Sequence, residues 1–308
     1  MKRINLAFRF WMILILLTQP ALSQNIGEYA RSSDRIVDGH LVDAGDAPWS
    51  VSLQYKNSHR CGGTLISPIL NRAQTAIIGW NSDDSMPEWM ITAAHCLVDS
   101  SGNFIRSDDL RVFSGAHKID SDAGEYQSIQ NFEIHPEYDD FLIVNDIAIV
   151  RLSRPTRPFL PRQRASIRLP LMQESVWLNR PNVPYVVAGW GRIAEGGAVS
   201  NDLLEVTIPR ADKANCEEIF ERFGHTVPMG TFCAGFLAGS QDSCQGDSGG
   251  AIFYRPPKNP SRFSWTSNPI FVGSVTWGIG CGSTEAYGLY TAVFPYIPWI
   301  TNYIEGHL

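Results

Sequence analysis

Residues 242–253 read DSCQGDSGGAIF, and they surround one serine, Ser248, with three glycines, two aspartates and a cysteine. Serine alone is a weak nucleophile, because its hydroxyl group holds its proton tightly at neutral pH. Glycine accepts backbone angles that other residues avoid, so a run of glycines permits an unusual loop with available N–H groups. The stretch therefore predicts a loop that presents an activated serine.

The rest of the chain is rich in short β-forming runs: WSVSLQY, LRVFSG, DIAIVRL, YVVAGWG, LLEVTI and IFVGSVTWG. Glycine, proline, asparagine and aspartate separate these runs, a pattern that is typical of an all-β sandwich or barrel. Two segments have the mixed pattern of a helix, ADKANCEEIFERF and, at the C-terminus, FPYIPWITNYI. The sequence has no repeat, low-complexity tract or Ser/Gly-rich linker, so we expect no accessory binding domain.

The composition excludes one class of partner. The chain has 308 residues, 44% of them hydrophobic, and a formal net charge of −6. This is enough apolar material for one large domain or two smaller cores. No basic tract stands out, whereas nucleic-acid binding requires clustered lysine and arginine. We therefore expect no nucleic-acid partner.

The N-terminal segment, MKRINLAFRFWMILILLTQPALSQ, has basic residues at its start, then a short apolar run and small residues. This order predicts a secretory signal peptide over residues 1–23, cut after Ser23. A membrane anchor is the alternative, but the apolar run at residues 10–17 is much shorter than the roughly 20 residues that span a bilayer. The segment favours a secreted, extracellular protein without membrane association.

All six cysteines follow this segment, and an even number in an oxidising compartment suggests three disulfides. Composition leaves the pairing open. No two cysteines have the spacing of a zinc motif, so we expect no metal site.

Three motifs stand in a fixed order along the chain: ITAAHC with His95, NDIAIVRL with Asp146, and GDSGG with Ser248. Each alone has an ordinary structural explanation, such as a turn or a capping residue. Together, in the order His, Asp, Ser, they are typical of one type of catalytic triad. The sequence resembles the secreted trypsin-like serine proteases of the chymotrypsin family. The resemblance runs from Arg35 to near the C-terminus and includes RIVDG, CGGTLIS, VAGWG, FCAG and VTWGIGCG.

This resemblance implies two six-stranded antiparallel β-barrels, packed side by side, with a C-terminal helix. It implies that His95 is the general base, that Asp146 orients it, and that Ser248 is the nucleophile of an endopeptidase that forms an acyl-enzyme. The N–H groups of Gly246 and Ser248 would form the oxyanion hole. No cofactor is expected.

The resemblance also assigns a substrate pocket. Asp242 would lie at its base and pair with arginine or lysine of the substrate. Ser243 adds a hydroxyl group, and Gly278 and Gly288 leave room for a long side chain. Residues 276–278 would pair with the substrate backbone. The full set for substrate binding is Asp242, Ser243, Thr276, Trp277, Gly278 and Gly288.

Activation is a further implication. Cleavage after Arg35 would release residues 24–35 as an activation peptide without cysteine, leaving residues 36–308 as the protease domain. The new α-ammonium group of Ile36 would pair with Asp247, since a buried carboxylate without a partner is costly. Before cleavage, His59 and Ser52 match the positions that hold this aspartate in related zymogens.

The resemblance implies the disulfides Cys61–Cys96, Cys216–Cys233 and Cys244–Cys281. A further disulfide of many relatives is replaced by Tyr185 and Tyr254, whose rings we expect to pack together. Thr276 stands where serine is usual and is expected to keep a hydroxyl group near Asp146. Tyr287 occupies a position where an aromatic residue accompanies sodium binding in some relatives. Residues 116 and 126 lack the carboxylates of a calcium site.

Residues 69–87, ILNRAQTAIIGWNSDDSMP, interrupt an otherwise continuous family-like hairpin. Hairpin loops of this length are uncommon. A surface loop at an exposed tip and a translated intron both explain the segment, and catalysis should survive in either case.

Expected partners are protein or peptide substrates with arginine or lysine, an activating protease and protein inhibitors, and a monomer is expected. The alternative function is an inactive protease homologue that acts as a binding module, although no triad residue is lost. A protease of different pocket preference is a second alternative, against which Asp242 argues. A digestive role and a cascade role both fit the sequence.

Overall fold

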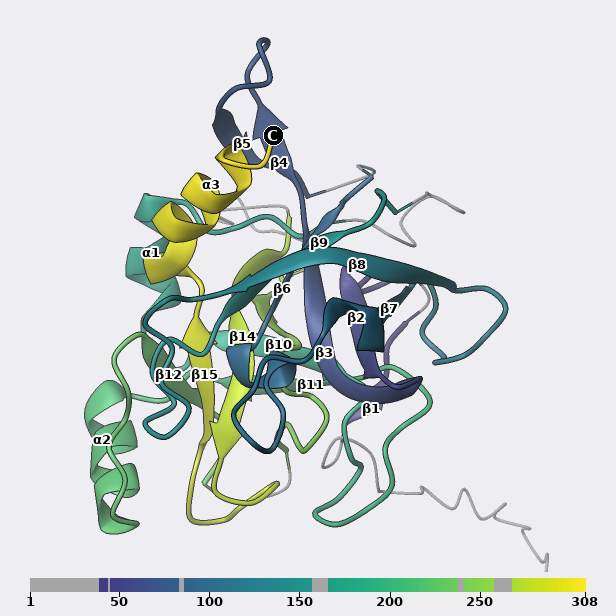
Figure 1. Ribbon diagram of the computed structural model, residues 1–308. Helices are drawn as coiled ribbons and strands as arrows, with labels where there is room; N and C mark the ends of the chain where they lie inside the picture. Colours follow the sequence, from purple (N-terminus) through teal and green to yellow (C-terminus); the bar gives the residue numbers. More distant parts are fainter. Residues whose placement is uncertain (1–38, 44, 83–85, 157–165, 238–240, 258–267) are drawn as a thin grey trace, which may run out of the picture. The chain divides into compact units, whose positions relative to one another are not determined.

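The computed structural model describes residues 39–308, except residue 44 and residues 83–85, 157–165, 238–240 and 258–267 (Figure 1). The expected signal peptide, Arg35 and Ile36 lie outside the described residues. No helix in the described part is long and apolar enough to cross a membrane.

Six antiparallel strands form a closed barrel in the order β2-β3-β6-β9-β8-β7. They are β2 (Ser50–Tyr55), β3 (Ser58–Ile66), β6 (Trp89–Thr92), β9 (Ala148–Leu152), β8 (Glu125–Ile134) and β7 (Leu110–Ser114). β2 and β3 are joined by Lys56 and Asn57, whose φ angles of 47° and 67° suit a tight hairpin turn. Closure leaves no free strand edge, and apolar side chains fill the interior, among them Val51, Leu53, Leu65, Met90, Val112 and Val150.

A second sheet has seven strands in the order β1-β11-β10-β13-β14-β15-β12. They are β1 (His40–Leu41), β11 (Leu204–Pro209), β10 (Pro184–Gly189), β13 (Ala251–Tyr254), β14 (Ile270–Gly278), β15 (Gly288–Ala292) and β12 (Thr231–Ala234). An isolated bridge between Arg210 and Ala234 joins the end of β11 to β12, so six of these strands form the expected second barrel. The expected all-β fold is confirmed, with β1 as an additional short strand on β11.

The described residues contain three α-helices beside the strands: α1 (Met172–Leu178), α2 (Lys213–Arg222) and α3 (Ile297–Glu305). The sequence predicted the last two. α2 begins where the Asp212 carboxylate accepts the N–H groups of Ala214 and Asn215, at 3.0 and 3.3 Å. α1 was not predicted, and it begins where Glu174 accepts the Leu171 N–H at 2.8 Å. Short 3₁₀ helices occur at η1 (Ala94–Leu97), η2 (Ser107–Asp109) and η3 (Phe294–Tyr296).

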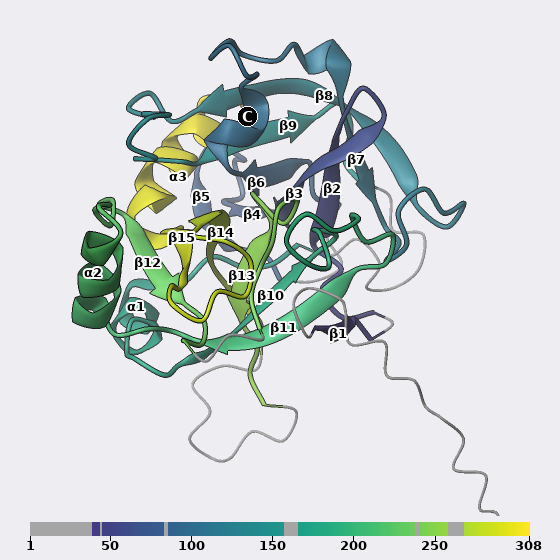
Figure 2. The same ribbon diagram turned by 90° about the horizontal axis from the view of Figure 1, so that it is seen from below.

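The two ends of the described chain cross over between the halves of the molecule. β1, at the beginning, pairs with β11 of the second sheet, where His40 lies opposite Glu205. α3, at the end, packs against the first barrel, with Tyr303 edge-on to Trp89 at 6.1 Å between ring centroids. Figure 2 shows α3 beside β9 and β1 beside β11.

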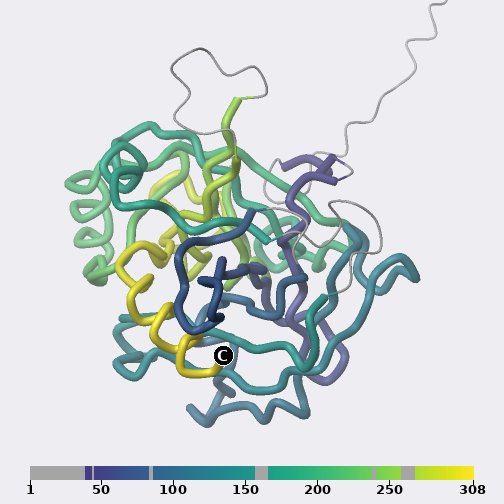
Figure 3. The backbone as a smooth tube through the Cα atoms, turned by 90° about the horizontal axis from the view of Figure 1, so that it is seen from above, coloured from purple at the N-terminus to yellow at the C-terminus, as the bar shows by residue number. Residues whose placement is uncertain are grey.

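The segment that interrupts the family-like hairpin forms a small two-stranded sheet of β4 (Pro68–Leu70) and β5 (Ile77–Trp80). Its tip is held by Asn71, whose side chain accepts the Thr75 N–H at 2.9 Å. The Glu305 carboxylate of α3 accepts the Ile77 N–H at 2.7 Å, so the sheet is attached to the C-terminal helix (Figures 1 and 3).

All three disulfides have the pairing that the resemblance implied, Cys61–Cys96, Cys216–Cys233 and Cys244–Cys281. The expected contact between Tyr185 and Tyr254 is wrong. Tyr185 packs against Phe232 with ring centroids 5.7 Å apart, and Tyr254 packs against Trp177 at 4.9 Å. The reason is that the buried Tyr185 turns its hydroxyl group to the Leu178 carbonyl at the end of α1.

Candidate active site

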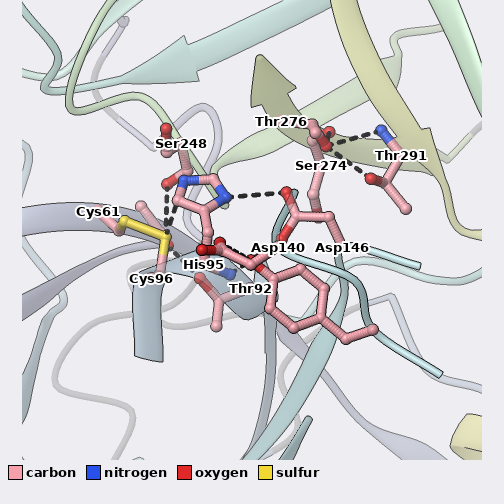
Figure 4. Close-up of polar contacts among 12 residues, drawn as sticks. Cys61, Thr92, His95, Cys96, Asp140, Asp146, Ser248, Ser274, Thr276 and Thr291 are labelled. Atoms are coloured by element: carbon pink, nitrogen blue, oxygen red, sulfur yellow. Dashed lines mark hydrogen bonds and ion pairs between the residues drawn. A yellow bond between two sulfur atoms is a disulfide. The ribbon is translucent and has the colours of Figure 1, made fainter. Parts of the chain in front are cut away.

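His95 and Asp146 form a hydrogen-bonded pair. His95 lies in η1 directly after β6, and the Cys61–Cys96 disulfide ties this turn to β3. His95 Nδ1 is 2.8 Å from Asp146 Oδ2, and the His95 backbone N–H donates to Asp146 Oδ1 at 2.9 Å (Figure 4). The Asp146 side chain is fully buried, whereas 27% of the His95 side chain is exposed. The carboxylate thus fixes the ring through Nδ1 and leaves Nε2 for other contacts.

The pKa of His95 is raised by this environment. Burial on its own lowers the pKa of the imidazole, but the charge of Asp146 and the hydrogen bond to it act in the opposite direction. The negative charge of Asp140 adds a smaller upward effect on the same pKa. The net result is an imidazole that takes up a proton more readily than a free histidine does.

Ser248 lies beside this pair, as Figure 4 shows. Its carbonyl oxygen accepts the Gly62 N–H at 2.8 Å and lies 3.7 Å from Cys96 Sγ, which in turn is 3.8 Å from His95 Nε2. No hydrogen bond joins the Ser248 hydroxyl group to His95 in the described structure. Such contacts are often long before a substrate binds.

The loop before Ser248 leaves two backbone donors unused. The N–H groups of Asp247 and Gly249 donate to carbonyls of Cys244 and Val275, at 2.9 and 2.8 Å. Those of Gly246 and Ser248 have no hydrogen-bond acceptor among the described residues. Gly246 has a φ angle of 99°, which side chains disfavour, and this angle explains why glycine stands there.

Asp247 is fully buried beneath this loop. Its carboxylate accepts the N–H groups of Gly191 and Cys244, at 2.7 and 2.8 Å. Burial raises the pKa of Asp247 to about 6, and these two hydrogen bonds oppose that rise. Within the described residues no cation forms an ion pair with it.

His59 and Ser52 are paired as expected, since Ser52 Oγ lies 2.8 Å from His59 Nδ1. The His59 ring makes no hydrogen bond within the described structure to Asp247, the residue that the resemblance implied as its partner. His59 Nε2 is 2.9 Å from the Gly246 carbonyl oxygen, which places the histidine on the loop itself. The carboxylate already accepts two N–H groups, whereas the Gly246 carbonyl needs a donor. Burial lowers the pKa of His59, so its neutral form is favoured.

A pocket of about 230 Å³ adjoins Ser248. It is lined by all six residues that the resemblance assigned to substrate binding, together with Ser248 and the Cys244–Cys281 disulfide. Gly288 has no room for a side chain, because an added Cβ would lie 3.0 Å from Asp242 Oδ1 and 2.8 Å from the Tyr290 hydroxyl group.

Asp242 is 6% exposed and accepts N–H groups from Ser243 at 2.8 Å and Gly282 at 3.1 Å. Burial raises its pKa to about 7, and the hydrogen bonds limit this rise. Tyr290, which sequence reasoning missed, contacts the pocket through its hydroxyl group, 3.1 Å from Ser243 Oγ. The contact of Tyr290 with Ser243 depends on how β15 pairs with its neighbours, which no sequence motif indicates.

The Thr276 hydroxyl group, which was expected near Asp146, makes its hydrogen bonds to other residues in the described structure. Its Oγ1 lies 2.6 Å from Thr291 Oγ1 and accepts the Thr291 N–H at 3.1 Å. The pairing of β14 with β15 shifts register between Val275 and Trp277, so Thr276 is the additional residue of a bulge facing β15.

The sequence is similar to those of known proteins. The family model described as Trypsin matches residues 36–71 and 85–300, and it leaves out the centre of the inserted segment. The chain is 31% identical to the serine proteinase stubble of Drosophila melanogaster over 286 residues. These aligned residues cover 90% of this chain and 32% of that protein. The chain is 32% identical to transmembrane protease serine 11C of Mus musculus over 268 residues, which cover 87% of this chain and 53% of that protein.

The trypsin Blo t 3 of Blomia tropicalis is 31% identical over 269 residues, which cover 86% of this chain and 84% of that protein. The chain thus spans about a third to a half of the first two relatives and most of the third. The chain belongs to the trypsin family of serine proteases, whose members are serine endopeptidases.

Proposed function

We propose that this chain is a secreted serine endopeptidase that cleaves peptide bonds after arginine and lysine. The observation that carries the proposal is the pocket beside Ser248, since its only charged lining residue within the described part is the buried Asp242. A carboxylate that is largely removed from water attracts a cationic side chain strongly. The guanidinium group of arginine and the ammonium group of lysine are the side chains that match it.

The proposed reaction uses Ser248, His95 and Asp146. His95 Nε2 removes the hydroxyl proton as Ser248 Oγ attacks the substrate carbonyl carbon, after a rotation of the serine side chain. The same nitrogen then donates this proton to the leaving amine, and the acyl-enzyme forms. A water molecule, deprotonated by His95, then attacks the acyl carbonyl carbon, and His95 returns the proton to Ser248 Oγ as the acid product leaves. Asp146 accepts the Nδ1–H hydrogen bond and stabilises the imidazolium ion in both steps.

The N–H groups of Gly246 and Ser248 would stabilise the negative oxygen of each tetrahedral intermediate. Their lack of acceptors in the described structure supports this role, because a donor that is free in the resting protein is available for the intermediate.

Activation by cleavage after Arg35 is part of the proposal, as are the signal peptide over residues 1–23 and the activation peptide over residues 24–35. The state of Asp247 supports it: a fully buried carboxylate whose pKa is raised to about 6 gains from a cationic partner. The α-ammonium group of Ile36 would provide this partner and hold the loop of Gly246 and Ser248 in place.

The test is a peptide-library profile of the activated enzyme, with Ser248→Ala as the paired variant. We expect cleavage after arginine and lysine, and a fall in kcat/KM of roughly 10⁴-fold or more in Ser248→Ala with an unchanged melting temperature. Cleavage mainly after phenylalanine or leucine would refute the specificity. Absence of any cleavage by the activated protein would favour the inactive binding module.

A further inference from the structure

A second cavity, of about 190 Å³, lies between α1 and the strands β12, β14 and β15. It shares no lining residue with the substrate pocket. Most of its wall is apolar, and its polar groups come from Ser175, Asn179, Thr231 and Arg210. The apolar lining comprises Pro170, Leu178, Phe232, Val272, Ala292, Phe294 and Pro295.

Arg210 is held rigidly at the edge of this cavity. Its backbone N–H donates to the Val183 carbonyl at 2.9 Å, and its own carbonyl accepts the Asn182 N–H at 2.8 Å. The guanidinium carbon lies 5.5 Å from the centroid of the Phe232 ring, and Nη1 donates to the Ala211 carbonyl at 2.9 Å. Nε is buried and has no hydrogen-bond partner in the described structure.

The charge of Arg210 is not part of an ion pair within the part of the chain that the structure describes. None of the ion pairs among the described residues includes this side chain, and no carboxylate lines the cavity. Burial lowers the pKa of Arg210, whereas the charges of Tyr185 and Asp212 and a hydrogen bond with the Tyr185 side chain act in the opposite direction. The Asp212 carboxylate already caps α2 through two N–H groups. A partly desolvated cation that has no ion-pair partner among the described residues gains from contact with an anionic ligand.

We propose that this cavity is a binding site for a small organic monocarboxylate. The carboxylate would lie on the guanidinium group of Arg210, because the planar fork of arginine matches two carboxylate oxygens. The hydrocarbon part would contact the apolar wall around Phe232 and Val272. The site does not depend on the proposed catalytic function.

The experiment measures binding of sodium benzoate to the full chain by isothermal titration calorimetry, with benzyl alcohol as the uncharged probe. We expect saturable binding of one benzoate per chain and much weaker binding of benzyl alcohol. Arg210→Met should weaken the binding of benzoate roughly 10-fold or more, since the charged hydrogen bonds are lost. Asp242 repels an anion, so the substrate pocket should not compete for benzoate.

The matched control is Arg111→Met. Arg111 is also half-buried and lies over an aromatic ring, 3.9 Å from the centroid of Tyr126, but it lies on β7 of the first barrel. This variant should bind benzoate as the unsubstituted protein does. Equal benzoate affinity in Arg210→Met, absence of saturable binding to the unsubstituted protein, or equal affinity for benzyl alcohol would overturn the proposal.

A second measurement needs no substitution and keeps the proposal testable if Arg210→Met does not fold. A crystal soaked in 4-bromobenzoate should give an anomalous bromine peak inside the cavity, with the carboxylate on Arg210. A peak only at another place, or no peak, would contradict the assignment.

Discussion

Two aspartates of one loop have opposite tasks. Asp242 and Asp247 are both buried, and burial raises the pKa of each, to about 7 and about 6. Asp242 lines an open pocket, so the cation that it is proposed to meet is a substrate side chain. Asp247 lies beneath the loop, so its proposed cation is the new end of the chain itself. In both cases the energetic cost of a buried charge becomes the driving force for the next partner.

The pKa of Asp242 predicts how selectivity depends on pH. Below about pH 7 the empty pocket holds a neutral Asp242, which attracts arginine less, so the preference should fall as the pH decreases. Between pH 8 and pH 6 the ratio of kcat/KM for an arginine substrate to that for a leucine substrate should fall about tenfold. The ionisation of His95 affects both substrates equally and cancels in the ratio.

The control for this measurement is Asp242→Ser, in which the ratio should be small and independent of pH. A ratio that stays constant in the unsubstituted enzyme across this range would contradict the role of Asp242.

At the scale of elements, the inserted segment is a hairpin that depends on the C-terminal helix. The Glu305 carboxylate accepts the Ile77 N–H, and Ile77 and Trp80 pack against the hydrophobic core that α3 also contacts. The hairpin contributes no residue to the pocket beside Ser248. We therefore expect it to affect local stability without affecting catalysis.

Glu305→Ala should release the hairpin. Loss of one charged hydrogen bond should increase amide hydrogen exchange at Ile77–Trp80 roughly fivefold or more, with kcat/KM unchanged. Hydrogen exchange measured by mass spectrometry checks this, with the exposed Glu285→Ala as the control. Unchanged exchange would show that the contact does not hold the hairpin. Peptide mass spectrometry of the protein from its natural source decides separately between a surface loop and a translated intron, since a peptide recovered from inside residues 69–87 would confirm the segment.

The sequence was most informative where function depends on contiguous motifs. His95, Asp146 and Ser248 were identified because each stands in its own short motif, and the three disulfides followed from the same resemblance. The hydrogen-bond partner of Thr276 was not predicted, because it depends on a bulge in the pairing of β14 with β15 that no motif indicates. The contact of Tyr290 with Ser243 and the contact of His59 with the Gly246 carbonyl were not predicted for a similar reason. Both depend on which groups lie opposite each other after the chain has folded.

At the scale of the whole molecule, activation would change the stability of the protein as well as its activity. In the uncut chain the folded pKa of Asp247, about 6, exceeds that of an unfolded aspartate. Stability is therefore lost as the pH rises from about 4 to about 6, because the unfolded chain releases this proton first. Pairing with Ile36 would lower the pKa of Asp247 and remove the loss above pH 6.

Arg35→Gln tests this as a chain that cannot be cut at that site. Its activity should fall about 100-fold or more, because the oxyanion donors are not held in place. The cut chain should have a higher free energy of unfolding than the uncut Arg35→Gln chain, and this difference should be larger at pH 8 than at pH 5. Urea denaturation of both chains measures it. Arg31→Gln is the control and should activate normally. Full activity of uncut Arg35→Gln would contradict the mechanism.

The crossing of β1 and α3 between the halves has a consequence for any attempt to divide the protein. Each disulfide joins residues within one half, so no covalent cross-link connects the barrel of β2 to the sheet of β10. A break of the chain between β9 and α1 would give two fragments. The N-terminal fragment would carry β1, which pairs with the sheet of the other fragment. The C-terminal fragment would carry α3, which packs against the barrel of the first fragment. Co-expressed fragments should therefore reassemble into one noncovalent complex, whereas either fragment produced by itself should aggregate or be degraded.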